Sequence, residues 1–172
     1  MSSVMFTRIV ATMCVAVIAC APVPAIAADL SVDKSNAVVA DQVNSLTPGR
    51  NLPGATIDYT LVVSNPLLNS VAIRRVVIAD VIPATVKFRI LPYGTGSTPV
   101  EFTNGNLLTI PLGSSGLSYS GIEYSDGTSW TYVPRDDGTG YDGNIRGIRV
   151  TMSTGAMNNG GSFRLRYRVL LK

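Results

Sequence analysis

Residues 55–65, Ala55-Thr-Ile-Asp-Tyr-Thr-Leu-Val-Val-Ser-Asn65, alternate between apolar and polar side chains and constrain the fold more than any other segment. Successive side chains of a β-strand point to opposite sides, so this pattern predicts a strand with one buried face. That face carries Ile57, Tyr59, Leu61 and Val63. The apolar run of residues 76–82 ends at Pro83, which cannot donate a hydrogen bond within a sheet. Together the two segments predict two strands of an antiparallel sandwich.

The rest of the chain has the composition of an all-β protein. Gly, Pro, Asn, Ser and Thr interrupt it every several residues, and β-branched residues fill the intervals. We expect strands near residues 30–40, 55–64, 72–81, 85–91, 107–112, 117–124, 129–133, 145–152 and 162–171. This number of short strands favours an immunoglobulin-like antiparallel β-sandwich of about 7–9 strands, with a closed barrel as the alternative.

Two strand patterns resemble those of a bacterial domain family. Its signature is Tyr-Thr-hydrophobic-x-Val-x-Asn, found here at residues 59–65, followed by Val-x-Val-x-Asp-x-hydrophobic-Pro, found at residues 76–83 with Ile78 at the second valine. The family is an immunoglobulin-like conserved repeat of unknown function in secreted and cell-surface proteins. The resemblance covers residues 30–83 and returns at residues 124–130 and 145–152. Family members usually stand in tandem arrays, whereas this chain contains a single copy.

The first 27 residues have the features of a secretory signal peptide. Arg8 precedes the apolar run Ile9–Ile18, and Ala25-Ile-Ala27 provides a small-x-small cleavage site. We therefore expect a mature protein of residues 28–172, exported to the extracellular space or cell surface, with the periplasm as another destination. A second reading is a lipoprotein attached through Cys20, because Val17-Ile-Ala-Cys20 loosely matches a lipidation motif.

The composition of the mature chain excludes several classes of function. The chain has no histidine, and both cysteines, Cys14 and Cys20, lie in the leader. Serine–histidine and cysteine–histidine nucleophiles and histidine-bearing zinc sites are therefore excluded, and we do not expect an enzyme. Without Arg8 the 14 basic residues become 13 against 11 acidic ones, a formal charge of +2. This near-neutral balance gives no reason to expect a nucleic-acid partner, and no later segment predicts a transmembrane span.

Acidic residues suggest one metal site and one structural site. The loop of residues 135–144 offers hard oxygen ligands for Ca²⁺ from Asp136, Asp137, Asp142 and Asn144, although Asp-Gly pairs are also ordinary in turns. Asp80 has the same parity as Val76 and Ile78, so it should lie at the margin of the core. There we expect it to accept backbone N–H groups of a neighbouring loop. Tyr59, Asp80 and Pro83 are thus structural candidates.

Aromatic residues gather in the second half of the chain. A sugar-stacking ridge is one interpretation, and alternation of these residues between core and loop is the other. The candidates for a glycan site are Tyr124, Trp130, Tyr132 and Tyr141.

The last strand predicts a basic stripe. Its residues alternate between an apolar face and an arginine face, and Arg149 has the outward parity in the preceding strand. If these two strands pair, they form one face for an anionic glycan, a lipid headgroup or an acidic protein patch, or simply a solvated surface. This face would carry Arg149, Arg164, Arg166 and Arg168.

These observations together predict a secreted, non-enzymatic structural or adhesive protein. It would contact other surface or matrix proteins, or further copies of itself, and needs no cofactor apart from the candidate Ca²⁺. One alternative is a carbohydrate-binding module built on Trp130. Another is a fibre subunit in which the segment around residues 29–34 pairs with a neighbour by β-strand exchange.

Overall fold

Strands account for all the regular elements among the residues that the structure describes, as the alternating segments predict. The computed structural model describes residues 29–41, 49–106 and 113–172, and these contain nine strands and no helix. The strands are β1 (Ser31–Ala40), β2 (Thr56–Ser64), β3 (Val76–Val81), β4 (Val86–Arg89), β5 (Val100–Asn104), β6 (Ser118–Ser125), β7 (Tyr141–Asp142), β8 (Gly147–Ser153) and β9 (Ser162–Leu171). The predicted leader and the predicted strand 107–112 lie outside the described residues.

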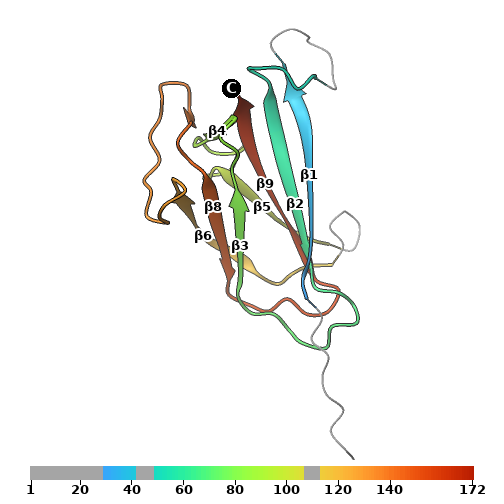
Figure 1. Cartoon of the computed structure of the whole chain (residues 1–172). Helices are drawn as coiled ribbons and strands as arrows, with labels where there is room; N and C mark the ends of the chain where they lie inside the picture. The colour runs from blue at the N-terminus through green and yellow to red at the C-terminus, as the bar shows by residue number, and fades with distance from the viewer. Residues whose placement is uncertain (1–28, 42–48, 107–112) are drawn as a thin grey trace, which may run out of the picture.

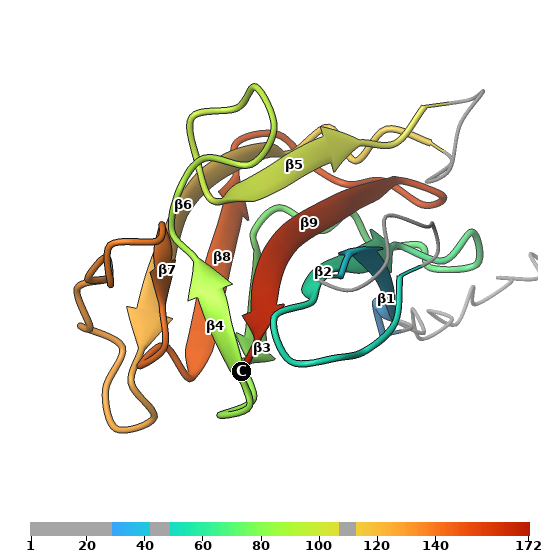
Figure 2. The ribbon, with the colours of Figure 1, turned by 90° about the horizontal axis from the view of Figure 1, so that it is seen from above.

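The strands pair into two antiparallel sheets that pack face to face (Figure 1, Figure 2). The larger sheet has six strands in the order β1-β2-β9-β4-β7, and β5 pairs with the part of β9 that β4 leaves free. The smaller sheet has the order β3-β8-β6. The predicted all-β sandwich is confirmed, while its immunoglobulin-like identity stays a prediction. In the described part of the chain, no helix is long and apolar enough to cross a membrane.

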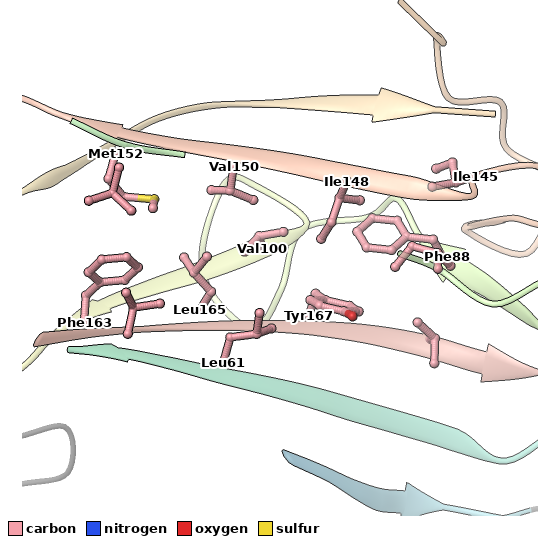
Figure 3. Packing of buried hydrophobic residues seen from close by; sticks show 14 of the residues in the cluster. Leu61, Phe88, Val100, Ile145, Ile148, Val150, Met152, Phe163, Leu165 and Tyr167 are labelled. Atoms are coloured by element: carbon pink, nitrogen blue, oxygen red, sulfur yellow. The ribbon is translucent and has the colours of Figure 1, made fainter. Parts of the chain in front are cut away.

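The core lies between the sheets and follows the alternation of the sequence. Ile57, Leu61 and Val63 are buried from β2, and every second residue of β9 from Phe163 to Val169 is buried beside them. The smaller sheet contributes Ile148, Val150 and Met152 from β8 (Figure 3). Tyr59 is half-buried and stacks on Tyr167, with 5.4 Å between ring centroids. The predicted buried face of residues 57–63 is therefore confirmed.

Strand boundaries differ from the expectation in the middle of the chain. Residues 129–133 form no strand; Tyr132 makes only an isolated bridge to Tyr124. β5 and β7 were not predicted, because one follows a Gly- and Ser-rich stretch and the other lies inside an Asp-Gly loop. β3 ends at Val81, before Pro83, which agrees with the inability of proline to donate to a sheet.

The last two strands do not pair, so the condition for one arginine face that joins them is not met. β8 lies between β3 and β6 in the smaller sheet, whereas β9 lies at the centre of the larger one. Residues 154–161 carry the chain from one sheet to the other, with Thr154 at φ 58° and Gly155 at φ 85°. These left-handed conformations mark a turn directly after β8, from which the chain crosses to the larger sheet. The residues that face outward from β8 and β9 consequently lie on opposite sides of the sandwich.

Candidate functional site

The arginines of β9 lie on the outer face of the larger sheet and face acidic partners on both neighbouring strands. We call Arg164, Arg166 and Arg168 the arginine ladder. Arg168 lies opposite Asp58 of β2, and its Nε and Nη2 donate to Asp58 Oδ1 and Oδ2 at 2.6 and 2.9 Å. This two-pronged geometry makes a strong charge-assisted pair. Asp58 is only 7% exposed although it belongs to the polar face of β2.

Tyr93 covers this pair from the connection between β4 and β5. Its hydroxyl donates to Asp58 Oδ2 at 2.5 Å, and its ring centroid lies 4.8 Å from Arg166 Cζ and 5.2 Å from Arg168 Cζ. Burial alone would raise the pKa of Asp58, but hydrogen bonds from Arg168 and Tyr93 outweigh it and lower that pKa. Burial and the bond to Asp58 raise the pKa of the Tyr93 hydroxyl.

The other members of the ladder have partners on β5. Arg166 forms an ion pair with Glu101 at 3.0 Å, and Arg164 Nη2 lies 3.5 Å from Thr103 Oγ1. Arg149 lies on the other sheet, so the prediction of one arginine face that includes it is wrong, for the topological reason given above. Because Arg166 and Arg168 already pair with acidic residues of the same chain, the geometry favours a stabilising role for them, and not the binding of an external anion.

Asp80 lies at the margin of the core, as its parity predicts, but its partners are not those expected. Backbone donors were predicted, whereas Asp80 Oδ2 accepts the Tyr167 hydroxyl at 2.7 Å and Oδ1 accepts Lys34 Nζ at 2.7 Å. The Lys34 ammonium also lies 4.8 Å from the centroid of the Tyr59 ring. Burial and the nearby Asp80 raise the pKa of Tyr167. Because Asp80 belongs to β3, these contacts join the smaller sheet to β1 and β9 of the larger one.

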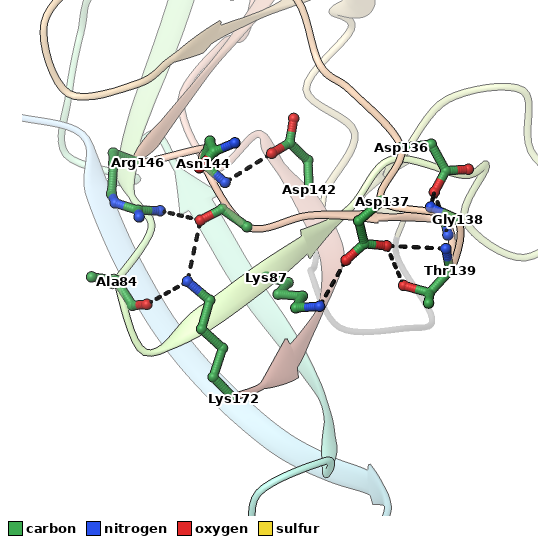
Figure 4. A network of polar contacts seen from close by, with 12 residues as sticks. Ala84, Lys87, Asp136, Asp137, Gly138, Thr139, Asp142, Asn144, Arg146 and Lys172 are labelled. Carbon is green, nitrogen blue, oxygen red and sulfur yellow. Dashed lines mark hydrogen bonds and ion pairs between the residues drawn. The ribbon is translucent and has the colours of Figure 1, made fainter.

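The carboxylates proposed for Ca²⁺ bind groups of the protein and point in different directions (Figure 4). Asp142 Oδ2 accepts the Tyr132 hydroxyl and the Arg135 N–H, and its Oδ1 accepts the Asn144 N–H at 2.8 Å. Asp136 accepts two backbone N–H groups, and Asp137 forms an ion pair with Lys87 at 2.7 Å. The described residues contain no group of three acidic side chains placed to hold a metal. The geometry favours turn formation for these side chains, and the Ca²⁺ site stays a hypothesis.

The aromatic residues proposed for glycan stacking do not form one ridge. Tyr124 packs edge-on against Phe88 at 5.9 Å, and burial raises its pKa to about 12. Tyr132 donates to Asp142, and Tyr141 lies in β7 of the larger sheet. Trp130 lies apart from them, on the outer face of the smaller sheet, where Arg149 Cζ is 4.1 Å from the centroid of its ring.

Trp130 lines an open groove, the Trp130 groove. Its walls are Ala79, Asp80, Val81, Ser125, Gly127, Thr128, Trp130, Arg146 and Gly147, and its volume is about 500 Å³. The ring lies so close to the sheet that a Cβ on Gly147 would be 3.1 Å from Trp130 Cη2. The absence of a side chain at Gly147 therefore lets the indole approach β8 closely. Val81, 75% exposed at the end of the edge strand β3, forms an apolar wall.

A second exposed apolar feature, which the sequence did not predict, is formed by residues 65–71 between β2 and β3; we call it the leucine loop. Leu67 and Leu68 are 76% and 94% exposed. Buried Asn65 donates from Nδ2 to the carbonyl oxygens of Val71 and Met157, and buried Asn69 donates to Asn65 Oδ1 at 2.7 Å. Two leucines inside the turn sequence Asn65-Pro-Leu-Leu-Asn69 were the one sequence signal that could have indicated this loop.

Asp58 and Tyr93 were also not predicted as site residues, because nothing in the local pattern shows that a distant loop covers β2.

Comparisons with known proteins do not identify this chain: no family model, no curated protein and no solved structure matches it.

Proposed function

We propose that this chain is an exported, non-enzymatic structural or adhesive protein that works through protein contacts at the bacterial surface or in the matrix. The export part rests on the signal-peptide pattern of residues 1–27. The contact part rests on the distribution of exposed apolar side chains, which is the observation that carries the proposal.

Five of the nine large hydrophobic residues that are exposed in the described part of the chain lie between residues 67 and 81: Leu67, Leu68, Val71, Val77 and Val81. This stretch runs through the leucine loop into β3, an edge strand of the smaller sheet. These side chains form two separate exposed apolar features, the leucine loop and the outer face of β3 with Val77 and Val81, and exposed apolar features of this kind can mark sites for a protein partner. By contrast, the charged groups of the arginine ladder and Asp80 bind other parts of the same fold.

The experiment measures binding of the exported, processed protein to washed cells of the source bacterium. Val77→Ser/Val81→Ser changes two exposed side chains and should lower retention on the cells about tenfold or more, since a few apolar anchors carry most interface energy. Val133→Ser, which changes an exposed valine outside this stretch, is the matched control. Equal retention of all variants would contradict the proposal, as would a turnover that a single Asp or Glu substitution abolishes.

A second candidate, a fibre subunit built by strand exchange, is favoured by the surroundings of β1. Nine of its ten residues are exposed, although it pairs along its whole length with β2. Its detachment would therefore remove few buried apolar contacts, which is typical of a segment that opens locally. Residues 41–55 connect it to β2 and are long enough to let β1 reach a neighbour.

Strand exchange predicts that deletion of residues 28–36 converts fibres into soluble folded monomers. Such monomers should accept a peptide of residues 28–40 in trans. Wild-type protein that stays a monodisperse monomer at high concentration would exclude this candidate.

A further inference from the structure

We propose that the leucine loop of one copy docks in the Trp130 groove of the next copy, so that the protein associates head to tail. This inference deepens the proposed function and rests on it, since it names a second copy of the chain as one partner of the exposed apolar stretch.

The leucine loop is held in a fixed shape while its tip stays uncovered. Asn65 binds Val71 and Met157, and Asn69 N–H closes a turn onto the Pro66 carbonyl at 3.0 Å. Asn159 Nδ2 also donates to the Leu67 carbonyl. A Cβ on Gly160 would lie 2.7 Å from Leu67 Cδ2, so the neighbouring connection closely backs the base of the loop. A loop ordered in this way loses little conformational entropy when its leucines bind, which favours affinity.

The Trp130 groove has the properties of a receptor for such side chains. Its volume of about 500 Å³ falls within the range of about 300–1,000 Å³ that small-ligand sites use. Ala79, Val81 and the Trp130 ring give it apolar walls, and tryptophan is a frequent anchor of protein interfaces. The polar groups of Arg146 and Arg149 have partners already: Arg146 donates to the Gly143 and Ile145 carbonyls, and Arg149 pairs with Glu123 at 3.3 Å.

The two features lie at opposite ends of β3. The connection from β2 to β3 is at the lower end of Figure 1, whereas the groove lies at the other end of β3, where the strand finishes at Val81. A contact between two different surfaces of one molecule is heterologous. Unless its rotation closes a ring, it continues from copy to copy into a filament.

Charges beside the two features are complementary. Arg74 and Arg75 follow the leucine loop; both are exposed, and neither has a partner among the described residues. Asp126 stands between the groove residues Ser125 and Gly127, and its carboxylate is exposed. Its Oδ1 accepts the Thr128 and Ser129 N–H groups, which fixes the carboxylate beside the groove. The docked loop would bring two arginines toward this acidic rim.

The test uses two variants that each remove one side of the contact. The loop variant is Leu67→Ser/Leu68→Ser, and the groove variant is Val81→Arg, which alters an exposed side chain and spares the core. Trp130→Ala is a second groove variant, and Val133→Ser is the matched control. Analytical ultracentrifugation of the exported, processed protein measures particle mass over a concentration series, and circular dichroism checks that each variant folds.

Head-to-tail docking gives a specific pattern. Wild type and the control should grow continuously in mass with concentration, and each loop or groove variant alone should bind at least about tenfold more weakly. An equimolar mixture of the loop variant with a groove variant should give a one-to-one complex and nothing larger, because one intact loop meets one intact groove. Asp126→Arg should weaken association, and mixing it with Arg74→Asp/Arg75→Asp should restore growth in mass with concentration, because both loop–groove contacts between the two variants then join opposite charges.

Several results would overturn the inference. Wild type that stays monomeric up to about 1 mM has no such contact, and a dimer of fixed size that all variants retain has a different interface. Binding of anionic phosphatidylglycerol vesicles that the loop variant loses and the groove variant keeps would assign the leucines to a lipid surface. Glycan binding lost only in Trp130→Ala would assign the groove to a sugar. Retention on cells is measured in a separate experiment. A failure of head-to-tail association can therefore be distinguished from a failure of the proposed adhesive function.

Discussion

The pair formed by Asp58 and Arg168 gives the sharpest test of how the outer face of the larger sheet contributes to stability. Asp58→Asn keeps the shape of the side chain and removes its charge. Two bonds from Arg168 and one from Tyr93 end on this carboxylate, and Asp58 is nearly buried. Breaking a fully buried ion pair costs about 3–5 kcal/mol, and a single hydrogen bond to a charged group contributes about 1.5–3 kcal/mol.

The expected loss is smaller than the buried limit because the Arg168 side chain is 27% exposed and water screens it once its partner is gone. We expect Asp58→Asn to lower the free energy of unfolding by about 2–3 kcal/mol, or the melting temperature by about 4–12 °C. Urea denaturation at pH 7 measures the loss. Asp33→Asn, at an exposed position of β1, is the matched control and should change stability by less than about 0.5 kcal/mol.

The effect of Asp58→Asn should depend on pH in one direction. Folding lowers the pKa of Asp58, so the folded protein holds the ionised carboxylate more strongly than the unfolded chain does. The stabilisation is complete above the ordinary aspartate value of 3.8 and disappears as pH falls through the lower folded value. Wild type and Asp58→Asn should therefore converge in stability in strong acid. A difference below about 0.5 kcal/mol at pH 7, or one that persists unchanged in acid, would refute this account.

Other consequences follow from the core, the inter-sheet contacts, the acidic loop and the leader. Leu61→Ala should cost about 2–5 kcal/mol in urea denaturation, since the side chain is buried; an unchanged midpoint would contradict the packing. Tyr167→Phe should cost about 1.5–3 kcal/mol by removing the donor to Asp80. Millimolar Ca²⁺ should leave the melting temperature unchanged because Asp142 already accepts protein donors, and a rise would support the Ca²⁺ hypothesis. Intact-mass measurement of the exported protein should place its N-terminus at Ala28. A lipidated N-terminal Cys20 would instead indicate that the protein is processed as a lipoprotein.

Much of the fold could be predicted because β-strands with one buried face show a local alternation of apolar and polar residues. The inward parity of Ile57, Leu61 and Val63 follows from a period of two, which a burial pattern confirms residue by residue. The marginal position of Asp80 followed from the same rule. Such predictions succeed because the direction of a side chain in a strand depends only on its neighbours in sequence.

The candidate site depended on contacts between residues far apart in the chain, and the sequence could not supply them. Arg149 and Arg168 have the same outward parity, yet they face opposite sides because residues 154–161 cross between sheets. Asp58 accepts a hydrogen bond from Tyr93, which lies 35 residues away in the chain, and no local pattern shows this contact. The sequence alone determined which side chains of each strand point toward the core and which point toward the outer face. The tertiary structure decided which strands are neighbours, and therefore which charges are paired and which apolar surfaces remain exposed, because sheet pairing is set by long-range packing and not by the local pattern.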